Sequence, residues 1–224
     1  MIKIVVTGAK GRMGARILAL AKESGEFEIA GEVDQGDSLS AAVEGADAVI
    51  DFSVADAAGR NAEIAAEHGA PIVVGTTGIP PDGEALIRKA AEKVAVVYAP
   101  NMSVGVNVML KIVKTASRAL GTGYAVDMEE THHVHKVDKP SGTAKRLIDM
   151  VRDEHPDGVP CKSIREGEVV GDHTVRFSTP FETIEITHNA HTRDVFASGA
   201  LTAARWVAGK PAGLYGMDDV LGLK

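Results

Sequence analysis

Cysteine and aromatic residues are the scarcest side chains in this sequence, and their scarcity excludes several kinds of protein. Cys161 is the single cysteine among 224 residues, so the chain forms no internal disulfide and no cysteine-based zinc site. Aromatic residues make up only 4% of the chain, whereas glycine occurs 24 times. A composition rich in alanine, valine and glycine favours an α/β protein over a β-sandwich.

Long apolar runs and positive net charge are also lacking. No apolar stretch approaches the roughly 18–20 residues that a membrane span needs. The first residues enter a predicted strand directly, so we expect no signal peptide and a reducing, cytoplasmic location. The formal net charge is −7 and the sequence pI is about 5.6. Without a long basic stripe, this balance argues against nucleic acid and membranes as partners.

The first hundred residues alternate short β-branched runs with helical patterns. Strands are predicted at residues 2–6, 27–33, 48–53, 71–74 and 94–98, and helices at 15–24, 38–44, 55–68 and 82–92. This alternation predicts an α/β fold with a doubly wound parallel sheet of the Rossmann type. Ligands of such sheets bind beyond the carboxyl ends of the strands.

A glycine turn follows the first predicted strand. Gly8, Gly11 and Gly14 form a Gly-x-x-Gly-x-x-Gly pattern, and Ala9 stands where the stricter dinucleotide fingerprint has a glycine. Between a strand and a helix, such glycines let main-chain amides approach a pyrophosphate. Asp34 lies 20 positions after Gly14, where a carboxylate can bind the ribose hydroxyls of NAD and repel a 2′-phosphate.

The glycine turn, Asp34 and the loops after the strands each have an alternative interpretation. The glycine turn would bind nothing if it were only structural, and Asp34 could simply cap a turn. Lys10 and Arg12 could still reach a 2′-phosphate, so NADPH stays open beside NADH. The loops at 75–78 and 99–102 follow predicted strands and are expected to flank the nicotinamide, unless they are ordinary turns.

The pattern changes after residue 103. Helices are predicted at 104–120, 141–154 and 197–207, and strands at 124–130, 163–166, 173–179 and 182–189. This order predicts a smaller α+β domain in which helices cover one side of an open sheet. The tail at 213–221 carries apolar residues that should pack back on the first domain.

The most unusual stretch of this acidic chain is basic. Residues 132–146 contain three histidines, three lysines and one arginine against a single aspartate. Such a local excess of cations suggests a site for a small anion. An extended backbone would place His132 and Lys136 on one face and His133 on another. The helix that opens at residues 141–143 offers amides that can hold a carboxylate.

Four interpretations of this stretch compete. A metal site is disfavoured because the histidines lack helical i, i+4 spacing and a cysteine partner. A nucleic-acid site is disfavoured because no aromatic residues interleave the cations. A solvated charge run is the bland alternative. We favour a pocket for a carboxylate-bearing substrate near a hydride donor, where an ammonium can stabilise or protonate the negative charge left by hydride addition.

A family resemblance becomes specific at residues 130–144, Glu-Thr-His-His-Val-His-Lys-Val-Asp-Lys-Pro-Ser-Gly-Thr-Ala. This motif resembles the signature of the 4-hydroxy-tetrahydrodipicolinate reductases, formerly called dihydrodipicolinate reductases. The similarity runs along the whole chain. Further matching motifs are Gly-Arg-Met-Gly at 11–14, Ile-Asp-Phe-Ser at 50–53, Gly-Thr-Thr-Gly at 75–78, Ala-Pro-Asn-Met-Ser-Val-Gly-Val-Asn at 99–107, Arg-Glu-Gly at 165–167, Gly-Asp-His-Thr-Val at 171–175, Glu-Ile-Thr-His at 185–188 and Phe-Ala-Ser-Gly-Ala at 196–200.

The resemblance implies an NAD(P)H-dependent oxidoreductase of the diaminopimelate route to lysine, which acts on a small dicarboxylate and is usually a homotetramer. It implies that His132 is catalytic and Lys136 is the proton donor. The implied substrate-carboxylate ligands are His133, Gly142 and Thr143. The implied cofactor contacts are Gly8, Ala9, Lys10, Gly11, Arg12, Met13, Asp34, Gly75, Thr76, Thr77, Ala99, Pro100, Asn101 and Met102. No metal site is implied.

The resemblance also implies a division of labour along the chain. Residues 1–103 and 195–224 would form the dinucleotide-binding domain, and residues 104–194 the substrate-binding and oligomerisation domain. The sequence departs from the family pattern in three places. Gln35 replaces a frequent arginine, which makes dual use of NADH and NADPH the expectation. Met102 replaces a common phenylalanine, and the segment at 38–48 is short, as in a compact member.

Two other functions compete with this reductase. An extended short-chain dehydrogenase shares the glycine pattern but needs Tyr-x-x-x-Lys. The tyrosines at 98, 124 and 215 are followed four residues later by Met102, Met128 and Asp219, so that class is excluded. A non-catalytic, NAD(H)-binding redox-sensing regulator remains as the alternative. No role is assigned to His135, Lys139, Lys145 and Arg146.

Overall fold

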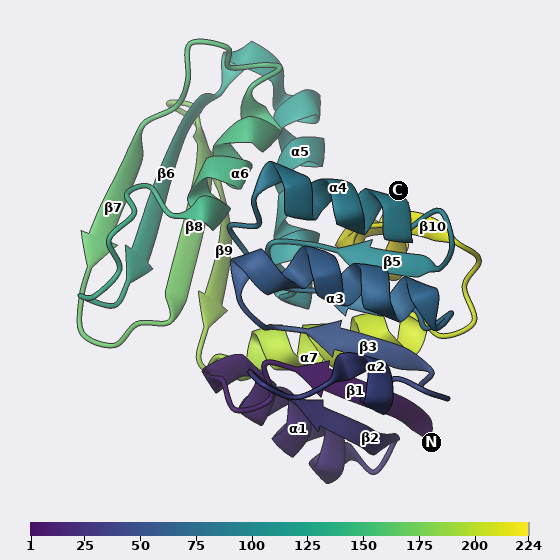
Figure 1. Ribbon diagram of the computed structural model, residues 1–224. Helices are drawn as coiled ribbons and strands as arrows, with labels where there is room; N and C mark the ends of the chain where they lie inside the picture. Colours follow the sequence, from purple (N-terminus) through teal and green to yellow (C-terminus); the bar gives the residue numbers. More distant parts are fainter. Residues whose placement is uncertain (224) are drawn as a thin grey trace. The chain divides into compact units, whose positions relative to one another are not determined.

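The computed structural model describes residues 1–223 and divides the chain into two compact units (Figure 1). The first unit comprises Met1–Val104 together with the chain from Asp194 onward. The second unit comprises Gly105–Arg193. Within the described residues, no helix is long and apolar enough to cross a membrane.

The first unit is built on a sheet of six parallel strands in the order β10-β5-β4-β3-β1-β2. Its strands are β1 (Ile2–Thr7), β2 (Phe27–Val33), β3 (Ala48–Asp51), β4 (Ile72–Val74), β5 (Ala95–Tyr98) and β10 (Gly213–Tyr215). Its helices are α1 (Arg12–Ser24), α2 (Leu39–Ala42), α3 (Ala55–Glu67), α4 (Pro81–Ala90), α7 (Asp194–Val207) and α8 (Met217–Val220). The predicted doubly wound sheet is confirmed.

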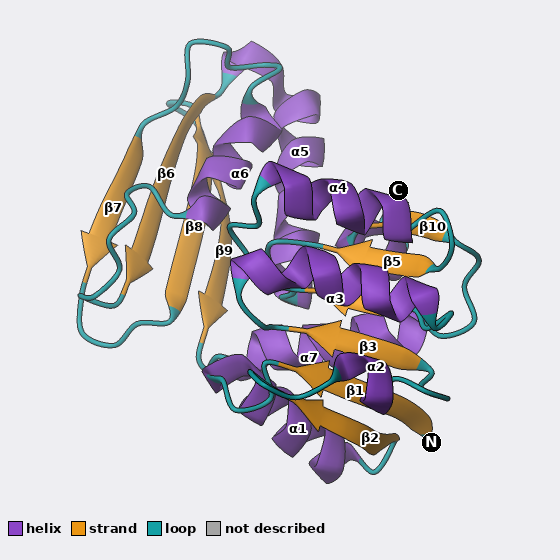
Figure 2. Ribbon diagram, in the orientation of Figure 1, coloured by secondary structure: helices purple, strands orange, loops and turns teal. Residues whose placement is uncertain are grey.

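Both faces of this sheet are buried because apolar residues run continuously along its strands. Ile4 and Val6 belong to the core cluster that includes α1 and α7. Val5, between them, belongs to the second cluster, with α3 and α4. Successive side chains of a strand point to opposite faces, so one β-branched run supplies both cores. Figure 2 shows the helices on both faces of the sheet.

The C-terminal tail packs on the first unit, as predicted, and it also supplies a strand that the sequence did not reveal. Met217 is buried in the α1–α7 core cluster, and the ring centroids of Trp206 and Tyr215 lie 5.0 Å apart. β10 pairs in parallel with β5. The equally short β4 consists of β-branched residues, whereas β10 is Gly-Leu-Tyr and has none, so its sequence indicates only an apolar tail.

The second unit is the predicted α+β arrangement. Its sheet has the order β7-β6-β8-β9, with β6 (Ala125–His132), β7 (Cys161–Arg165), β8 (Gly171–Ser178) and β9 (Thr183–Ala190). β6 and β7 are parallel, whereas the other neighbours are antiparallel. Helices α5 (Val104–Leu120) and α6 (Gly142–Val151) share one apolar core with β6 and β8 and cover one face (Figure 1). A 3-10 turn, η1 (Gly121–Gly123), follows α5.

One difference in element boundaries bears directly on function. β6 continues to His132 and ends there, and residues 134 and 135 form a turn. The amide of Lys136 donates a hydrogen bond to the carbonyl of His133, at 3.1 Å. The expectation that extended backbone carries His132 and Lys136 onto one face is therefore wrong, because the alternation rule ends with the strand.

Candidate active site

The turn between β1 and α1 has the tight packing that its glycines predict. Gly8 has a φ of 71°, and a Cβ atom there would lie 2.3 Å from the carbonyl oxygen of Phe52. A Cβ atom at Gly14 would lie 2.1 Å from the carbonyl oxygen of Gly8. No side chain caps the start of α1 at Gly11, and the first turn contains no acidic residue. Such a helix start suits a pyrophosphate.

The other residues of this turn differ in exposure. Ala9 is buried and its amide donates to the carbonyl of Val33, whereas Lys10 and Arg12 are exposed and Met13 is half-buried. The Asp34 carboxylate accepts hydrogen bonds from the amides of Lys10 and Gln35, each at 2.8 Å. These bonds, Gln35 first and then Lys10, lower the pKa of Asp34 below its usual value. Asp34 is therefore an anion at neutral pH, beside the glycine turn.

The loops after β4 and β5 lie at the same edge of the sheet, because Asp51, Val74 and Tyr98 are aligned in neighbouring parallel strands. Gly75 packs against the ring of Phe52, which a Cβ atom would approach to 2.2 Å. Thr76 is buried, and Thr77 is exposed.

In the loop after β5, Pro100 is exposed and Asn101 is half-buried, with its Oδ1 accepting the Ser103 amide at 2.9 Å. Ala99 is buried, and so is Met102, whose side chain belongs to the core of the first unit. Met102 is only 2% exposed, and its carbonyl oxygen packs against Gly199, where a Cβ atom would lie 1.8 Å from it.

Sequence reasoning missed the carboxylate that joins these strand ends. Asp51 is fully buried at the end of β3. It accepts hydrogen bonds from the hydroxyl of Thr7 at 2.7 Å, the hydroxyl of Thr76 at 2.5 Å and the amide of Asn61 at 2.7 Å. Ser53 adds a further hydroxyl donor. The motif at 50–53 is the sequence signal for this residue, although it assigns no role to Asp51. These contacts show that Asp51 ties the loop containing Thr76 to β1, β3 and α3.

The basic stretch forms the second group of candidate residues, and all of it lies in the second unit. His132 closes β6 and is 7% exposed. Its Nδ1 is hydrogen-bonded to the carboxylate of Glu130, which is also buried. Burial is the first cause that lowers the pKa of His132, and it outweighs the opposing effect of Glu130. His132 is therefore neutral at pH 7, with its proton on Nδ1 because an ionised carboxylate only accepts.

The other ring nitrogen of His132 faces β8. A Cβ atom at Gly171 would lie 3.0 Å from Nε2, so glycine leaves the room that the ring occupies. His173, across from Glu130 in the β6–β8 register, stacks edge to face on His132 with ring centroids 5.1 Å apart. Burial is the first cause that lowers the pKa of His173 to about 3, and the nearby His132 ring, which would repel a second proton, is the next. His173 is thus a neutral neighbour.

The residues between β6 and α6 bring a cation next to a helix start. The ammonium of Lys136 lies 2.7 Å from the carboxylate of Asp138. The pKa of Asp138 is held below its usual value, chiefly by the Lys136 ammonium and additionally by the Gly142 amide. Ser141 caps α6 by accepting the Ala144 amide at 3.1 Å. Gly142 is exposed and Thr143 is half-buried in the first turn.

The surroundings of His133 differ from those of His132 and suggest a different role. Its ring lies 6.1 Å from that of His135. Within the described part of the chain, its Nδ1 is buried and has no hydrogen-bond partner. A buried polar atom without a partner is uncommon in a folded protein and suits a ligand atom. His135, Lys139 and Lys145 are exposed.

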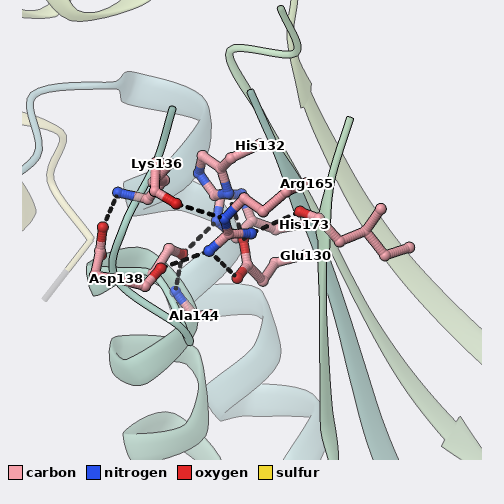
Figure 3. Close-up of polar contacts among 9 residues, drawn as sticks. Glu130, His132, Lys136, Asp138, Ala144, Arg165 and His173 are labelled. Carbon is pink, nitrogen blue, oxygen red and sulfur yellow. Dashed lines mark hydrogen bonds and ion pairs between the residues drawn. The ribbon is translucent and has the colours of Figure 1, made fainter. Parts of the chain in front are cut away.

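Glu130 and Arg165 are the site residues that sequence reasoning missed in this unit. Arg165 is the last residue of β7 and lies opposite His132. Its guanidinium forms a bidentate ion pair with Glu130 (Figure 3). Burial raises the pKa of Glu130, but hydrogen bonds from Arg165, Ser163 and His132 together bring it below the usual value. The motif Arg-Glu-Gly at 165–167 was the available signal, although it carried no role. No metal-binding group of three or more ligands occurs among the described residues.

Comparison with known proteins covers nearly the whole chain. Residues 2–102 match the family model described as dihydrodipicolinate reductase, N-terminus, and residues 105–221 match the model described as dihydrodipicolinate reductase, C-terminus. The 4-hydroxy-tetrahydrodipicolinate reductase of Anaeromyxobacter dehalogenans is 40% identical, covering 100% of this chain and 99% of the relative. That of Geobacter sulfurreducens is also 40% identical and fully covered. Both alignments extend over 267 positions, so these relatives have insertions that this compact chain lacks.

Several solved structures have the same fold as this chain. A dipicolinate-bound dihydrodipicolinate reductase from Paenisporosarcina sp. TG-14 matches with a TM-score of 0.85 at 20% identity, covering 98% of this chain and 99% of that one. A DAP dehydrogenase of C. glutamicum matches with a TM-score of 0.61 at 11% identity, covering 99% and 98%. At these identities the match concerns the fold alone. With two matching domain models and full-length relatives at 40% identity, the chain belongs to the dihydrodipicolinate reductase family.

Proposed function

We propose that this chain catalyses the NAD(P)H-dependent reduction of 4-hydroxy-tetrahydrodipicolinate to tetrahydrodipicolinate in lysine biosynthesis through diaminopimelate. The ring gains a hydride and a proton and loses water. Family membership supports the reaction type. The observation that carries the proposal is the Asp138 carboxylate, on which the Lys136 ammonium and the Gly142 amide both act. The first turn of α6 thus offers main-chain amides for a substrate carboxylate, and the Lys136 ammonium lies beside it for the charge that hydride addition creates.

The roles of the residues follow from their chemistry. His133, with its unpartnered Nδ1, and the first turn of α6 at Gly142 and Thr143 bind a substrate carboxylate. Lys136 stabilises the negative charge that hydride addition creates and delivers the proton. Neutral His132, whose Nε2 can accept a hydrogen bond, takes part in proton transfer next to Lys136. A bound dihydronicotinamide supplies the hydride.

The first unit is proposed to hold that nucleotide through the glycine turn, Asp34 and the loops at 75–77 and 99–102. The Asp34 anion favours NADH, because it repels a 2′-phosphate, whereas exposed Lys10 and Arg12 can attract one. Both cofactors are therefore used, with NADH at least comparable to NADPH. Paired steady-state kinetics test this expectation, and a hundredfold higher kcat/KM with NADPH would contradict the role given to Asp34.

The decisive assay for the function uses the purified chain, NADH and enzymatically generated substrate. Loss of NADH absorbance that depends on both protein and substrate is the expected result. A non-catalytic redox-sensing regulator predicts something different, namely NADH binding by fluorescence without turnover. That outcome would overturn the proposed reaction while leaving the dinucleotide site intact.

Assembly and location complete the proposal. The second unit is proposed to bind the substrate and to mediate a homotetramer. Two large apolar side chains near or in β9 are exposed, Phe181 at 94% and Ile184 at 40%, and exposed apolar residues of this kind suit a subunit interface. Light scattering that gives the mass of one chain would contradict the tetramer. A cytoplasmic location is also proposed, for which cell fractionation is the test.

A further inference from the structure

The ion pair of Glu130 and Arg165 is almost completely removed from water. The exposed fractions of the two side chains are 1% and 8%. Nη1 of Arg165 lies 3.1 Å from Oε2 of Glu130, and Nη2 lies 3.0 Å from Oε1. The pair joins two adjacent parallel strands, β6 and β7, at the level where both strands end. Two parallel N–H···O bonds fix the relative orientation of the groups as well as their distance.

The remaining donors of Arg165 all bind main-chain carbonyls. Nε donates to the carbonyl of Lys136 at 3.1 Å, Nη2 to that of Asp138 at 2.5 Å, and Nη1 to that of Ile164 at 2.6 Å. A guanidinium has five N–H groups, so every one of them has a partner. Two of the carbonyls belong to the loop that carries Lys136. Figure 3 shows Arg165 between these loop carbonyls and Glu130.

Glu130 acts on the other side of the pair. Its Oε2 also accepts the hydrogen bond from Nδ1 of His132. The charged and titratable groups around His132 are Glu130 on β6, Arg165 on β7, His173 on β8 and Lys136 in the loop. Among these groups, only Glu130 is an anion. It therefore holds the proton on Nδ1 and leaves Nε2 as an acceptor.

A role in stability alone does not account for this arrangement. A buried ion pair contributes little net stability, because the desolvation of both charges offsets their attraction, and apolar replacements of similar volume are often as stable. An apolar pair, however, would leave the carbonyls of Lys136 and Asp138 without their donors. It would also leave Nδ1 of His132 without an acceptor. The specific consequence of the pair is geometric, and it concerns the two residues proposed to handle protons.

We propose that Glu130 and Arg165 are positioning residues of the reaction, a single buried ion pair that sets the tautomer of His132 and anchors the Lys136 loop to β7. This assignment rests on the proposed function. Glu130 orients the histidine through its side chain. Arg165 places the ammonium by holding the main chain on either side of it, at residues 136 and 138.

Glu130→Gln tests the first half, with Glu129→Gln as the matched control. Glu129 is the neighbour on β6 and pairs with exposed Lys162. A glutamine lacks the charge and offers only one acceptor oxygen, so it cannot satisfy both Arg165 and His132. We expect ¹⁵N NMR of the imidazole to show loss of the pure Nδ1–H tautomer and titration of His132 at lower pH than in the parent chain. The acid limb of the kcat profile should move in the same direction.

Arg165→Lys tests the second half, with Arg176→Lys as its control. Arg176 also pairs with two carboxylates of the same sheet, Asp127 and Glu185, but near the surface. A lysine keeps the charge and cannot reach Glu130 and the loop carbonyls together. We expect kcat to fall at least about tenfold, with unchanged affinity for NADH and faster amide exchange at residues 136–139.

The outcomes separate the two claims. If the parent chain does not turn over substrate, the proposed reaction fails, whereas the NMR and exchange experiments still test the positioning. Unchanged ¹⁵N shifts in Glu130→Gln, or exchange and kcat in Arg165→Lys that match those of Arg176→Lys, would overturn the positioning role. Circular dichroism identifies a variant that does not fold. In that case, Glu130→Asp, which keeps the charge and withdraws the carboxylate, replaces it in the same comparison.

Discussion

At the scale of single residues, the site depends on burial that keeps histidines neutral. His132, His173 and His188 all have lowered pKa values, and burial is the first cause in each case. Neutral imidazoles beside Lys136 keep the local positive charge on the ammonium. Of these three histidines, His132 belongs to the basic stretch, where burial keeps it neutral next to the Lys136 ammonium.

The lowered pKa of His173, about 3 against an ordinary 6.5, predicts how stability depends on pH. Below pH 6.5 the unfolded chain binds a proton that the folded chain excludes, so stability is complete above that value and is lost as the pH falls towards 3. Between pH 7 and 5 the loss from this group is about 2 kcal/mol. Denaturant unfolding at both values measures it.

His173→Gln is the matching variant, because an amide can still reach Ser141, the present partner of Nε2 at 3.2 Å. Its acid destabilisation between pH 7 and 5 should be smaller by about that 2 kcal/mol. An equal loss in the variant and the parent chain would show that His173 does not exclude the proton. His132 and His188 add to the acid sensitivity of both proteins, and their coupling to His173 is part of the measured difference.

Gly171 provides a second prediction at this scale. An alanine Cβ would lie 3.0 Å from Nε2 of His132, so Gly171→Ala should push the ring aside and lower kcat about tenfold without affecting NADH binding. Gly123→Ala is the control, since nothing lies within 4 Å of a Cβ atom there and its φ is not positive. Equal kcat values for the two variants would show that the ring has room to move.

At the scale of elements, the ends of parallel strands in the first unit are joined by one carboxylate. Asp51 receives hydroxyl or amide donors from the end of β1, the loop after β4 and helix α3. Its partners are separated in sequence by as many as 44 residues. No local pattern reveals such a group, because only the folded sheet brings its donors together.

Asp51→Ala should consequently affect both stability and cofactor binding. Removal of the acceptor leaves several buried donors without partners, and we expect a loss of about 3 kcal/mol or more in the free energy of unfolding. The freed Thr76 loop should raise the KM for NADH. Asp47→Ala is the control, because Asp47 is exposed, at the opposite end of β3, and accepts a single hydrogen bond within residues 1–223, from the Lys3 amide. A wild-type KM in a folded Asp51→Ala protein would contradict the bracing role.

The comparison of elements also shows which parts of the fold and of the site could be predicted from the sequence. The periodic runs predicted the long helices and the central strands, because apolar spacing follows directly from which face is buried. β10 was missed because it has no β-branched residue, unlike the equally short β4. The layout of His132 and Lys136 was predicted from strand alternation and failed, because the turn at 134–135 interrupts the strand. Glu130 and Arg165 were missed because a buried ion pair between strands depends on register, which one sequence does not reveal.

At the scale of the whole molecule, the residues divide between two compact units. The residues proposed to bind the nucleotide lie in the first unit, and the candidate proton donors and carboxylate ligands lie in the second. This division predicts that the two activities can be separated. A change in the second unit should abolish turnover and leave nucleotide binding intact, which is a sharper expectation than general loss of activity.

Lys136→Ala tests that central claim most directly, with kcat and the Kd for NADH measured on the same protein. We expect kcat to fall by well over tenfold and the Kd to stay within about twofold of the parent value, since the ammonium acts only on the charge created during the reaction. Lys162→Ala, which removes an exposed lysine of the same unit, should leave both values unchanged. A fall in kcat of less than tenfold, on the order of 1.4 kcal/mol, would contradict the role of Lys136 as the proton donor.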